Sequence, residues 1–124
     1  PEYVEGLCVA FCVSHDIVTT VGWWASAMTG EKNAARDYLG PCMDAEPHWT
    51  LIRALSQSIA STLILPFQDV LGLDTRHRMN TPGTMGCWAW RFAWNWVGPQ
   101  HAEQLLRITA ASGRCELGRL RLPA

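Results

Sequence analysis

Two residues with catalytically competent side chains, His15 and Asp16, directly follow an apolar run of strand length, residues 6–13. In β/α barrels, polar residues at the carboxyl end of a strand form the catalytic rim. A carboxylate there can accept hydrogen bonds from sugar hydroxyls or stabilise developing positive charge, and a neighbouring histidine can donate to another hydroxyl. The alternative is structural, a loop histidine beside an aspartate that caps the next turn. Position and polarity alone favour the structural alternative.

A second apolar run, residues 62–67, leads into a long polar loop. The run suits one buried strand and is too short to indicate a helix, and Pro66 limits its ladder hydrogen bonds near the end. The loop then carries charged and amide side chains: Gln68, Asp69, Asp74, Arg76, His77, Arg78 and Asn80. Next comes Thr81-Pro82-Gly83-Thr84, in which proline in second and glycine in third position predict a type II turn. A strand that opens into a shaped polar loop is typical of ligand sites in α/β folds.

Tryptophan is abundant in this chain, and its seven residues are Trp23, Trp24, Trp49, Trp88, Trp90, Trp94 and Trp96. Indole faces stack on pyranose rings, but they suit core packing equally well. We expect Trp49 to lie in the core. The four residues from Trp88 onward recur mostly every second position, which predicts an extended or hairpin segment more strongly than sugar contact.

Helix signals occupy the chain between the two apolar runs. After a loop that leads into a short helix within residues 17–27, a helix is predicted over residues 31–39, bounded by Thr29 as a possible N-cap and by Gly40 and Pro41 as stop signals. Another helix should begin at Pro47 and run to about residue 60. Its apolar positions recur at helical spacing and predict a buried stripe of Trp49, Ile52, Leu55 and Ile59.

After the polar loop, one more helix is predicted over residues 99–112. Its inward positions should be Leu105, Leu106 and Thr109, and Gly113 should end it. We expect the short arginine-rich tail, residues 114–124, to be disordered. The order of strand, helices, strand and helix predicts an α/β fold in which the two strands are parallel. The first run is apolar enough on both pleat faces to suit a strand covered on both sides. Two parallel strands need further strands on their open edges, so the pattern indicates part of a larger sheet.

Composition narrows the class of protein. The 124 residues include 48% hydrophobic and 17% charged side chains, enough for one domain with a core. The net charge is −1 and the basic residues are scattered, which argues against a nucleic-acid partner. No apolar run approaches the roughly 18 residues that a membrane span needs, so the default expectation is a cytoplasmic protein without a membrane partner. Five cysteines without metal-type spacing predict mostly buried free thiols and no metal site.

Several short motifs, taken in order, resemble the 4-α-glucanotransferases of the amylomaltase, or disproportionating enzyme, family. The resemblance covers nearly the whole chain and is densest in the second polar loop. The motifs are Ser14-His15-Asp16, Thr19-Thr20, Gly22-Trp23-Trp24, Leu51-Ile52-Arg53, the run 68–73, the run 78–84, Trp88 and Trp90-Arg91.

The resemblance implies a C-terminal portion of a (β/α)8 TIM barrel, with residues 6–13 as the seventh strand and residues 62–67 as the eighth. A complete barrel needs roughly 250 residues. It also implies retaining transfer of an α-1,4-glucan segment to the 4-hydroxyl of another glucan or glucose, without a cofactor. The substrates would be maltooligosaccharides, amylose, glycogen or starch.

In that scheme Asp16 matches the third acidic residue, which holds hydroxyls of the distorted sugar, and His15 matches its neighbour in the same subsite. Asn80 and the Thr81-Pro82-Gly83 turn match a loop beside the donor and acceptor subsites. The family's nucleophilic Asp and acid/base Glu belong to the fourth and fifth strands, upstream of Pro1. Because retaining chemistry needs both carboxylates about 5 Å apart, this chain alone is expected to be inactive.

The sequence departs from the family pattern at two places. Ser14 stands for the usual threonine, with Ile17 and Val18 in place of a polar pair, and Cys87 stands where the family commonly has asparagine. The first residue is Pro1 and the chain enters an apolar run within a few residues, so material upstream is expected. Two alternatives to the enzyme portion stay open: a non-catalytic glucan-binding module, and a structural half-barrel that pairs with another copy.

Overall fold

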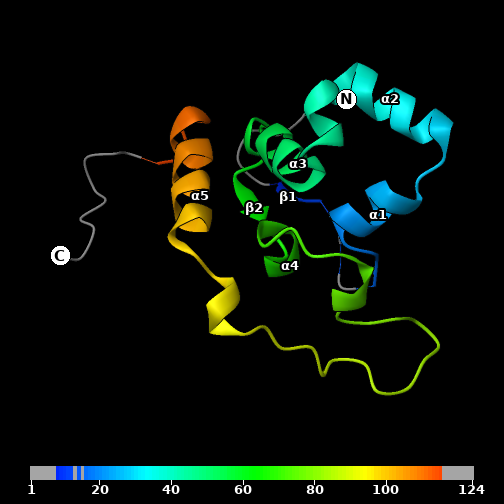
Figure 1. Ribbon diagram of the computed structural model, residues 1–124. Coiled ribbons are helices and arrows are strands. Elements are labelled where there is room, and N and C mark those ends of the chain that lie inside the picture. Colours follow the sequence, from blue (N-terminus) through cyan, green and yellow to red (C-terminus); the bar gives the residue numbers. More distant parts are fainter. Residues whose placement is uncertain (1–7, 13, 15, 116–124) are drawn as a thin grey trace.

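The computed structural model describes residues 8–12, 14 and 16–115. Along the chain the elements are β1 (Val9–Phe11), α1 (Thr20–Ser26), α2 (Thr29–Leu39), the 3-10 turn η1 (Pro41–Asp44), α3 (Pro47–Ser56), β2 (Thr62–Ile64), α4 (Phe67–Val70), the 3-10 turns η2 (Thr75–His77) and η3 (Trp94–Trp96), and α5 (Pro99–Ala111). Helix α3 packs between the α1–α2 pair and α5, and the long segment from η2 to η3 runs past the helices as an extended loop (Figure 1).

The two strands form a parallel pair, as predicted. Val9 lies opposite Thr62 and Phe11 opposite Ile64. Because the helices α1, α2 and α3 all lie between the strands in sequence, the pair is a βαβ unit. The second strand is shorter than predicted: it ends at Ile64, and Pro66 caps a helical turn that already includes Phe67. Residues 6, 7 and 13 of the first predicted strand lie outside the described residues.

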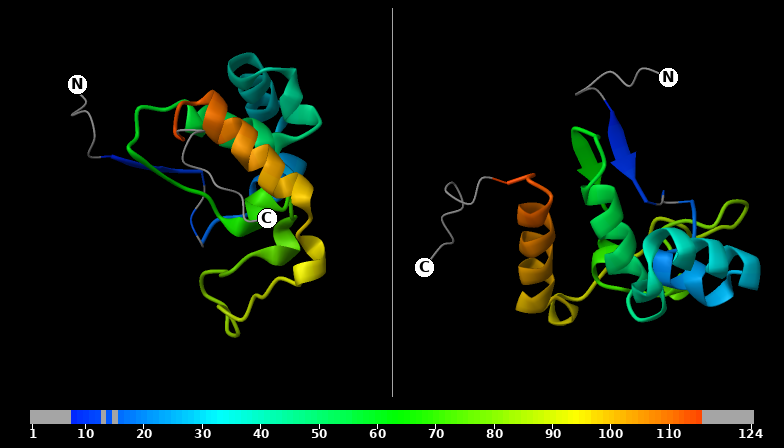
Figure 2. Two further views of the ribbon diagram at one scale, coloured as in Figure 1. Left: turned by 90° about the vertical axis from the view of Figure 1, so that its left-hand side faces the viewer. Right: turned by 90° about the horizontal axis from the view of Figure 1, so that it is seen from above.

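One face of the sheet is open, contrary to the prediction that the first strand is covered on both sides. Val9, Phe11 and Ile64 are 52%, 57% and 56% exposed. Leu63, which alternates with them, lines a cavity together with Ile52 of α3 and Ile108 of α5, so the helices cover the opposite face. Figure 2 shows the two strands side by side at the edge of the helical layer.

The core lies where α3, α4 and α5 meet. It consists of Trp49, Ile52, Val70 and Ile108, with Leu65, Phe67 and Leu105 packed against it. The predicted stripe on α3 is therefore confirmed for Trp49 and Ile52. It is wrong for Ile59, which is 62% exposed, because α3 ends at Ser56 and the helical register stops there.

Helix boundaries follow local chemistry closely. Gly40, at φ +91°, ends α2 and Gly113, at φ +69°, follows α5, both in the positive-φ region that glycine adopts without steric cost. Pro47 begins α3, as predicted. The N-cap prediction for α2 was wrong by one residue: Met28 is the cap, and its backbone N–H donates to Glu31 Oε2 at 2.8 Å.

On α5 the predicted inward positions Leu105 and Thr109 line the cavity that Leu63 also lines, and Ile108, which was not predicted, lies there too. Ile108 is buried and Leu105 packs on the core, whereas Thr109 is half-buried and its hydroxyl donates to the Leu105 carbonyl at 2.7 Å. A hydroxyl that bonds the preceding turn needs no place in the core. The apolar stripe of α5 is therefore centred one residue before Thr109.

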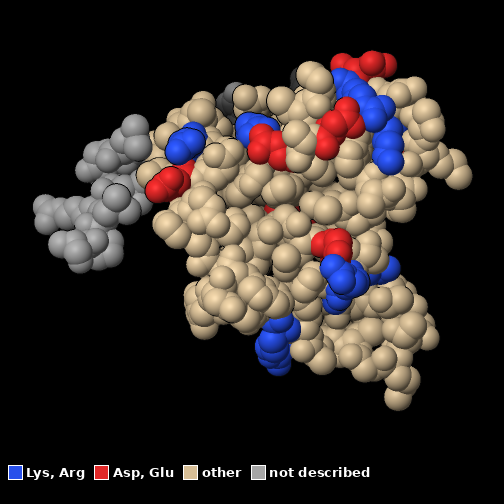
Figure 3. Space-filling model, viewed as in Figure 1, with Lys and Arg blue, Asp and Glu red and all other residues tan. Residues whose placement is uncertain are grey.

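Charged side chains of both signs intermix over the face in Figure 3 and form no large patch of one sign there. Arg36 of α2 and Asp44 of η1 form one ion pair, at 2.8 Å. None of the helices in the described part of the chain is long and apolar enough to cross a bilayer.

Arg114 ties the end of α5 to the turn between α3 and β2. Its guanidinium donates to the carbonyl oxygens of Ser56 at 2.6 Å, Ser58 at 2.8 Å and Ala60 at 2.8 Å. The Ser56 carbonyl belongs to the last turn of α3 and the other two lie beyond the helix, so none of the three has an acceptor role within the helix and each needs another donor. Arg114 was predicted to begin a disordered tail; residues 116–124 of that tail lie outside the described residues.

We expect Arg114→Ala to lower the free energy of unfolding by about 3 kcal/mol, because hydrogen bonds to a charged donor are worth about 1.5–3 kcal/mol each and these three share a partly exposed donor. Urea denaturation followed by tryptophan fluorescence measures the change. The matched control is Arg107→Ala, which removes an exposed arginine that lies 3.7 Å from Glu103 and should cost about 0–1 kcal/mol. Equal losses in both variants would contradict the assigned role of Arg114.

Candidate functional site

A pocket of about 350 Å³ opens at the carboxyl ends of both strands. The last residues of the strands, Phe11 and Ile64, contribute apolar walls. The remaining lining comes from the loops that follow each strand: Ser14, Ile17, Thr19, Pro66, Gln68, Asp69, Arg78 and Met79. Parallel strands end at the same edge of a sheet, so the two loops meet there although more than 50 residues separate them.

At the rim of this pocket, Asp16 and Asn80 are in direct contact. The Asn80 Nδ2 group donates a hydrogen bond to Asp16 Oδ1, and the Arg78 guanidinium donates to the backbone carbonyl of Asp16 at 2.8 Å. The structure therefore brings together the two polar stretches singled out in the sequence. A carboxylate held by an amide donor has a defined orientation, which a sugar-binding role requires. His15 lies outside the described residues.

The predicted turn after Asn80 is present. Gly83 has φ +79°, as the third position of a type II turn requires, and the Thr84 N–H donates to the Thr81 carbonyl at 3.1 Å. Thr81, Pro82 and Gly83 are exposed. Their assignment to substrate binding stays a prediction.

Cys87 closes the loop that carries this turn. Its Sγ accepts a hydrogen bond from the Thr81 N–H at 3.3 Å and lies 3.2 Å from Thr84 Oγ1. The backbone N–H of the next residue, Trp88, donates to the Met79 carbonyl at 2.9 Å, and Trp88 adopts a positive φ of 69°. Hydrogen bonds from the Thr81 backbone and the Thr84 hydroxyl lower the pKa of the Cys87 thiol. The five thiols form no disulfide, and none is fully buried, so the expectation of mostly buried thiols was wrong.

The lowered pKa of Cys87 predicts a specific pH dependence of alkylation. The thiolate is the reactive form, so a lower pKa moves the rise in iodoacetamide reactivity to lower pH. Thr84→Val removes one of the two hydrogen-bond partners that lower the pKa of Cys87, so we expect it to raise that pKa and to move the midpoint of alkylation to higher pH. Peptide mass spectrometry over a pH series follows Cys87 itself, and Thr29→Val, an exposed threonine on α2, serves as the control. An unchanged midpoint in Thr84→Val would contradict the hydrogen-bond cause.

Sequence reasoning assigned no role to Asp69. This acidic residue lines the pocket and is fully buried, with 0% exposure. Oδ1 accepts the Thr20 N–H at 2.8 Å, and Oδ2 accepts the Thr20 hydroxyl at 3.0 Å and the Cys12 thiol at 3.3 Å. Its position directly after the second apolar run was the available signal. No sequence pattern indicated its donors, which come from the loop after β1 and from the start of α1.

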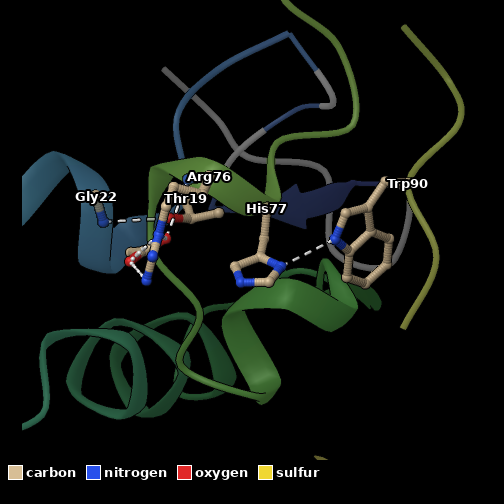
Figure 4. Close-up of polar contacts among 6 residues, drawn as sticks. Thr19, Gly22, Arg76, His77 and Trp90 are labelled. Atoms are coloured by element: carbon tan, nitrogen blue, oxygen red, sulfur yellow. Dashed lines mark hydrogen bonds and ion pairs between the residues drawn. The ribbon is translucent and has the colours of Figure 1, made fainter. Parts of the chain in front are cut away.

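Beyond the turn, the tryptophan-rich segment forms an aromatic cluster and not the extended hairpin that its spacing predicted. Trp90 Nε1 donates to His77 Nδ1 at 3.2 Å (Figure 4). The His77 ring also packs edge-on against Trp96 at 5.4 Å. Between residues 75 and 98, all of which the structure describes, no strand is formed, and Trp96 lies in the turn η3. The ring-to-ring contacts extend through Phe92 to Phe67 of α4 at 4.8 Å.

Three of these indoles remain exposed, Trp88 by 56%, Trp94 by 79% and Trp96 by 40%. Ring packing engages His77 with Trp90 and Trp96, and the exposed Trp94 ring packs edge-on against Phe92 at 5.0 Å. Within residues 8–12, 14 and 16–115, no group of three or more His, Cys, Asp or Glu side chains could hold a metal ion. The described groups in and beside the pocket include the carboxylates of Asp16 and Asp69, the amides of Gln68 and Asn80, the Arg78 guanidinium and the Phe11 ring.

Comparison with known proteins shows which family this chain is similar to. The family model described as 4-alpha-glucanotransferase matches residues 1–96. The 4-alpha-glucanotransferase of Synechocystis sp. is 38% identical over 114 residues, 91% of this chain and 23% of that protein. The enzyme of the same name from Thermus thermophilus is 34% identical over 116 residues, 89% of this chain and 23% of that protein.

A solved structure agrees with these relatives. The amylomaltase from Streptococcus agalactiae, in complex with acarbose, superposes with a TM-score of 0.84 at 27% identity, over 92% of this chain and 23% of that one. The chain thus spans less than a quarter of the length of these relatives. With a family match over most of its length, close relatives of one name and the same local fold, the chain belongs to the 4-alpha-glucanotransferase family.

Proposed function

We propose that this chain forms the sugar-holding part of a 4-α-glucanotransferase active site. The reaction would be retaining transfer of an α-1,4-glucan segment to the 4-hydroxyl of another glucan or of glucose. The observation that carries the proposal is the contact between Asp16 and Asn80 at the carboxyl ends of two parallel strands, in a chain of this family. Maltooligosaccharides, amylose, glycogen or starch would be the substrates.

In this proposal β1 and β2 are the seventh and eighth strands of a (β/α)8 barrel. The parallel pairing of the strands and the location of polar residues at their carboxyl ends both support it. The open apolar face supports it too, because Val9, Phe11 and Ile64 would point into a barrel interior filled by side chains of further strands. The relatives are more than four times longer than the matched segment, which is room for the other strands.

The proposed mechanism divides the carboxylates between two parts of the enzyme. Retaining transfer needs a nucleophile and an acid/base about 5 Å apart, and the family resemblance places both on the fourth and fifth strands, outside this sequence. Asp16 would accept hydrogen bonds from hydroxyls of the distorted sugar, and its negative charge would stabilise the positive charge that develops on the ring. Asn80 would hold that carboxylate in place, and His15 would bind the same sugar.

The pocket walls suit the other parts of a glucan. Phe11, Ile64 and Met79 offer apolar surface, whereas Gln68 and Arg78 offer hydrogen-bond donors, and this mixture matches the faces and hydroxyls of a pyranose. The exposed Thr81-Pro82-Gly83 turn would border the donor and acceptor subsites. No step of the scheme uses a cofactor.

A chimera tests the proposal. The segment of the Thermus thermophilus enzyme that matches this chain is replaced by residues 1–124, and glucose release from maltotriose is measured for the chimera and for the chain alone. We expect turnover by the chimera and none by the chain alone, because only the chimera contains both reacting carboxylates. A folded chimera without turnover would contradict the proposed function, and turnover by the chain alone would contradict the proposed division of the carboxylates.

A further inference from the structure

The residues at the two ends of the loop that carries Asp16 both donate hydrogen bonds to the same buried carboxylate, that of Asp69. Cys12, the residue after β1, and Thr20, the first residue of α1, both donate to Asp69, with Cys12 Sγ and Thr20 Oγ1 sharing Oδ2 at 3.3 and 3.0 Å. A short loop has few conformations once the separation of its ends is set. Asp69 therefore fixes the separation of Cys12 and Thr20, the two ends of the loop that carries Asp16.

Asp69 is suited to this task by its burial. A carboxylate removed from water is costly unless its oxygens accept hydrogen bonds, and here both oxygens do so. Thr20 is also buried, at 1% exposure, and its N–H belongs to the first turn of α1, where no helical carbonyl can accept it. The Thr19 hydroxyl satisfies a different donor, the Gly22 N–H at 3.2 Å (Figure 4), so the N-cap of α1 does not replace Asp69.

A second connection runs from the same helix to the other half of the site. Gly22 of α1 packs on Thr75, the first residue of η2: a Cβ at position 22 would lie 2.1 Å from Thr75 Oγ1. Asn80 follows Thr75 by only five positions, and Asp74 caps that segment by accepting the Arg76 N–H at 3.0 Å. Asp69 bonds the first residue of α1, and α1 in turn packs against η2. The segment after η2 contains Arg78 and Asn80, which bond Asp16.

We propose that Asp69 is a positioning residue for the Asp16–Asn80 pair, and that it acts through the two ends of the 12–20 loop and through α1. Its consequence for glucan affinity rests on the proposed function; its consequence for the geometry of the pair does not. Asp69 itself reaches the pocket with its oxygens already engaged by Thr20 and Cys12, so it acts on the sugar through other residues.

Three variants separate positioning from general stability. Asp69→Asn removes the charge and one of the two acceptor oxygens. Thr20→Val removes only the hydroxyl and keeps the shape, and Thr20→Ser keeps the hydroxyl as the conservative rescue. The control is Asp44→Asn, an acid whose partner is the exposed Arg36 and which lies in η1. Circular dichroism and urea denaturation establish that each variant is folded.

The first readout is the side-chain amide signal of Asn80 in ¹⁵N NMR spectra of the chain, assigned by its loss in Asn80→Ala. We expect Asp69→Asn and Thr20→Val to move this signal toward the position of a solvated asparagine, while Thr20→Ser and Asp44→Asn leave it in place. The second readout is the affinity for maltoheptaose from tryptophan fluorescence, which should fall at least fivefold in the first two variants and stay unchanged in the others.

The two readouts distinguish failure of the positioning role of Asp69 from failure of the proposed sugar-holding function. An unshifted Asn80 signal in folded Asp69→Asn overturns the positioning role, whatever the glucan affinity. If that variant does not fold, Thr20→Val against Thr20→Ser decides in the same way. A native chain that does not bind maltoheptaose counts against the proposed sugar-holding function, and the Asn80 signal still tests Asp69.

Discussion

Asp16→Asn in the chimera is expected to lower the turnover of maltotriose by about 10²–10³-fold, the cost of removing one well-placed electrostatic group from an active site. The asparagine keeps the size of the side chain and an oxygen that can accept the Asn80 amide, so only the negative charge is lost. In the proposed mechanism that charge stabilises the oxocarbenium-like transition state. The loss should therefore appear mainly in kcat, measured by glucose release.

Asp37→Asn is the matched control, since Asp37 is an exposed acid on α2. It should leave kcat and KM unchanged. Asp16→Ala, which removes the acceptor as well as the charge, should lower turnover further and raise KM. If Asp16→Asn kept the kcat of the parent chimera, Asp16 would have only the capping role that its loop position also allows.

Gly22→Ala is expected to destabilise the chain by about 1–3 kcal/mol, the usual cost of overpacking. The added methyl group would lie 2.1 Å from Thr75 Oγ1 and 3.0 Å from the Thr75 backbone nitrogen, so the side chain has to rotate and the backbone of η2 has to move. Because that segment leads to Arg78 and Asn80, glucan affinity should fall together with stability. Urea denaturation and maltoheptaose titration measure the two effects.

A second glycine provides the control for Gly22→Ala. Gly30 lies in the first turn of α2, and a Cβ there would meet no atom within 4 Å. Gly30→Ala should be neutral or stabilising by up to about 1 kcal/mol, because alanine favours the helix. The double variant Gly22→Ala/Thr75→Ala should recover part of the loss. Equal stability of Gly22→Ala and Gly30→Ala would show that η2 adapts without cost.

Much of the fold could be predicted from local signals. The start of α3 at Pro47 and the glycine residues that follow α2 and α5 depend on the conformational preferences of a few adjacent residues, and the parallel pair follows from the order of strand, helices and strand. The type II turn at Pro82 and Gly83 belongs to the same class. Predictions failed where the outcome depended on where an element ends, as with Ile59 beyond α3.

The tryptophan-rich segment shows why periodicity can mislead. Spacing by two residues is typical of a strand, but a strand also needs a partner for its backbone hydrogen bonds. Here the rings around His77 and Phe92 pack against each other and against α4, and this packing is compatible with an irregular backbone. No local signal distinguishes the two outcomes.

By itself the sequence determined which residue types stand at the ends of two strands. It also determined that Asp16 and Asn80 belong to polar loops that follow these strands. Only the tertiary structure decided that these two side chains meet, and that Asp69 accepts hydrogen bonds from Cys12 and Thr20. The physical reason is that turns and caps depend on neighbours within a few residues, whereas the partners of a buried carboxylate are chosen by burial and by contacts across 49 and 57 residues of chain.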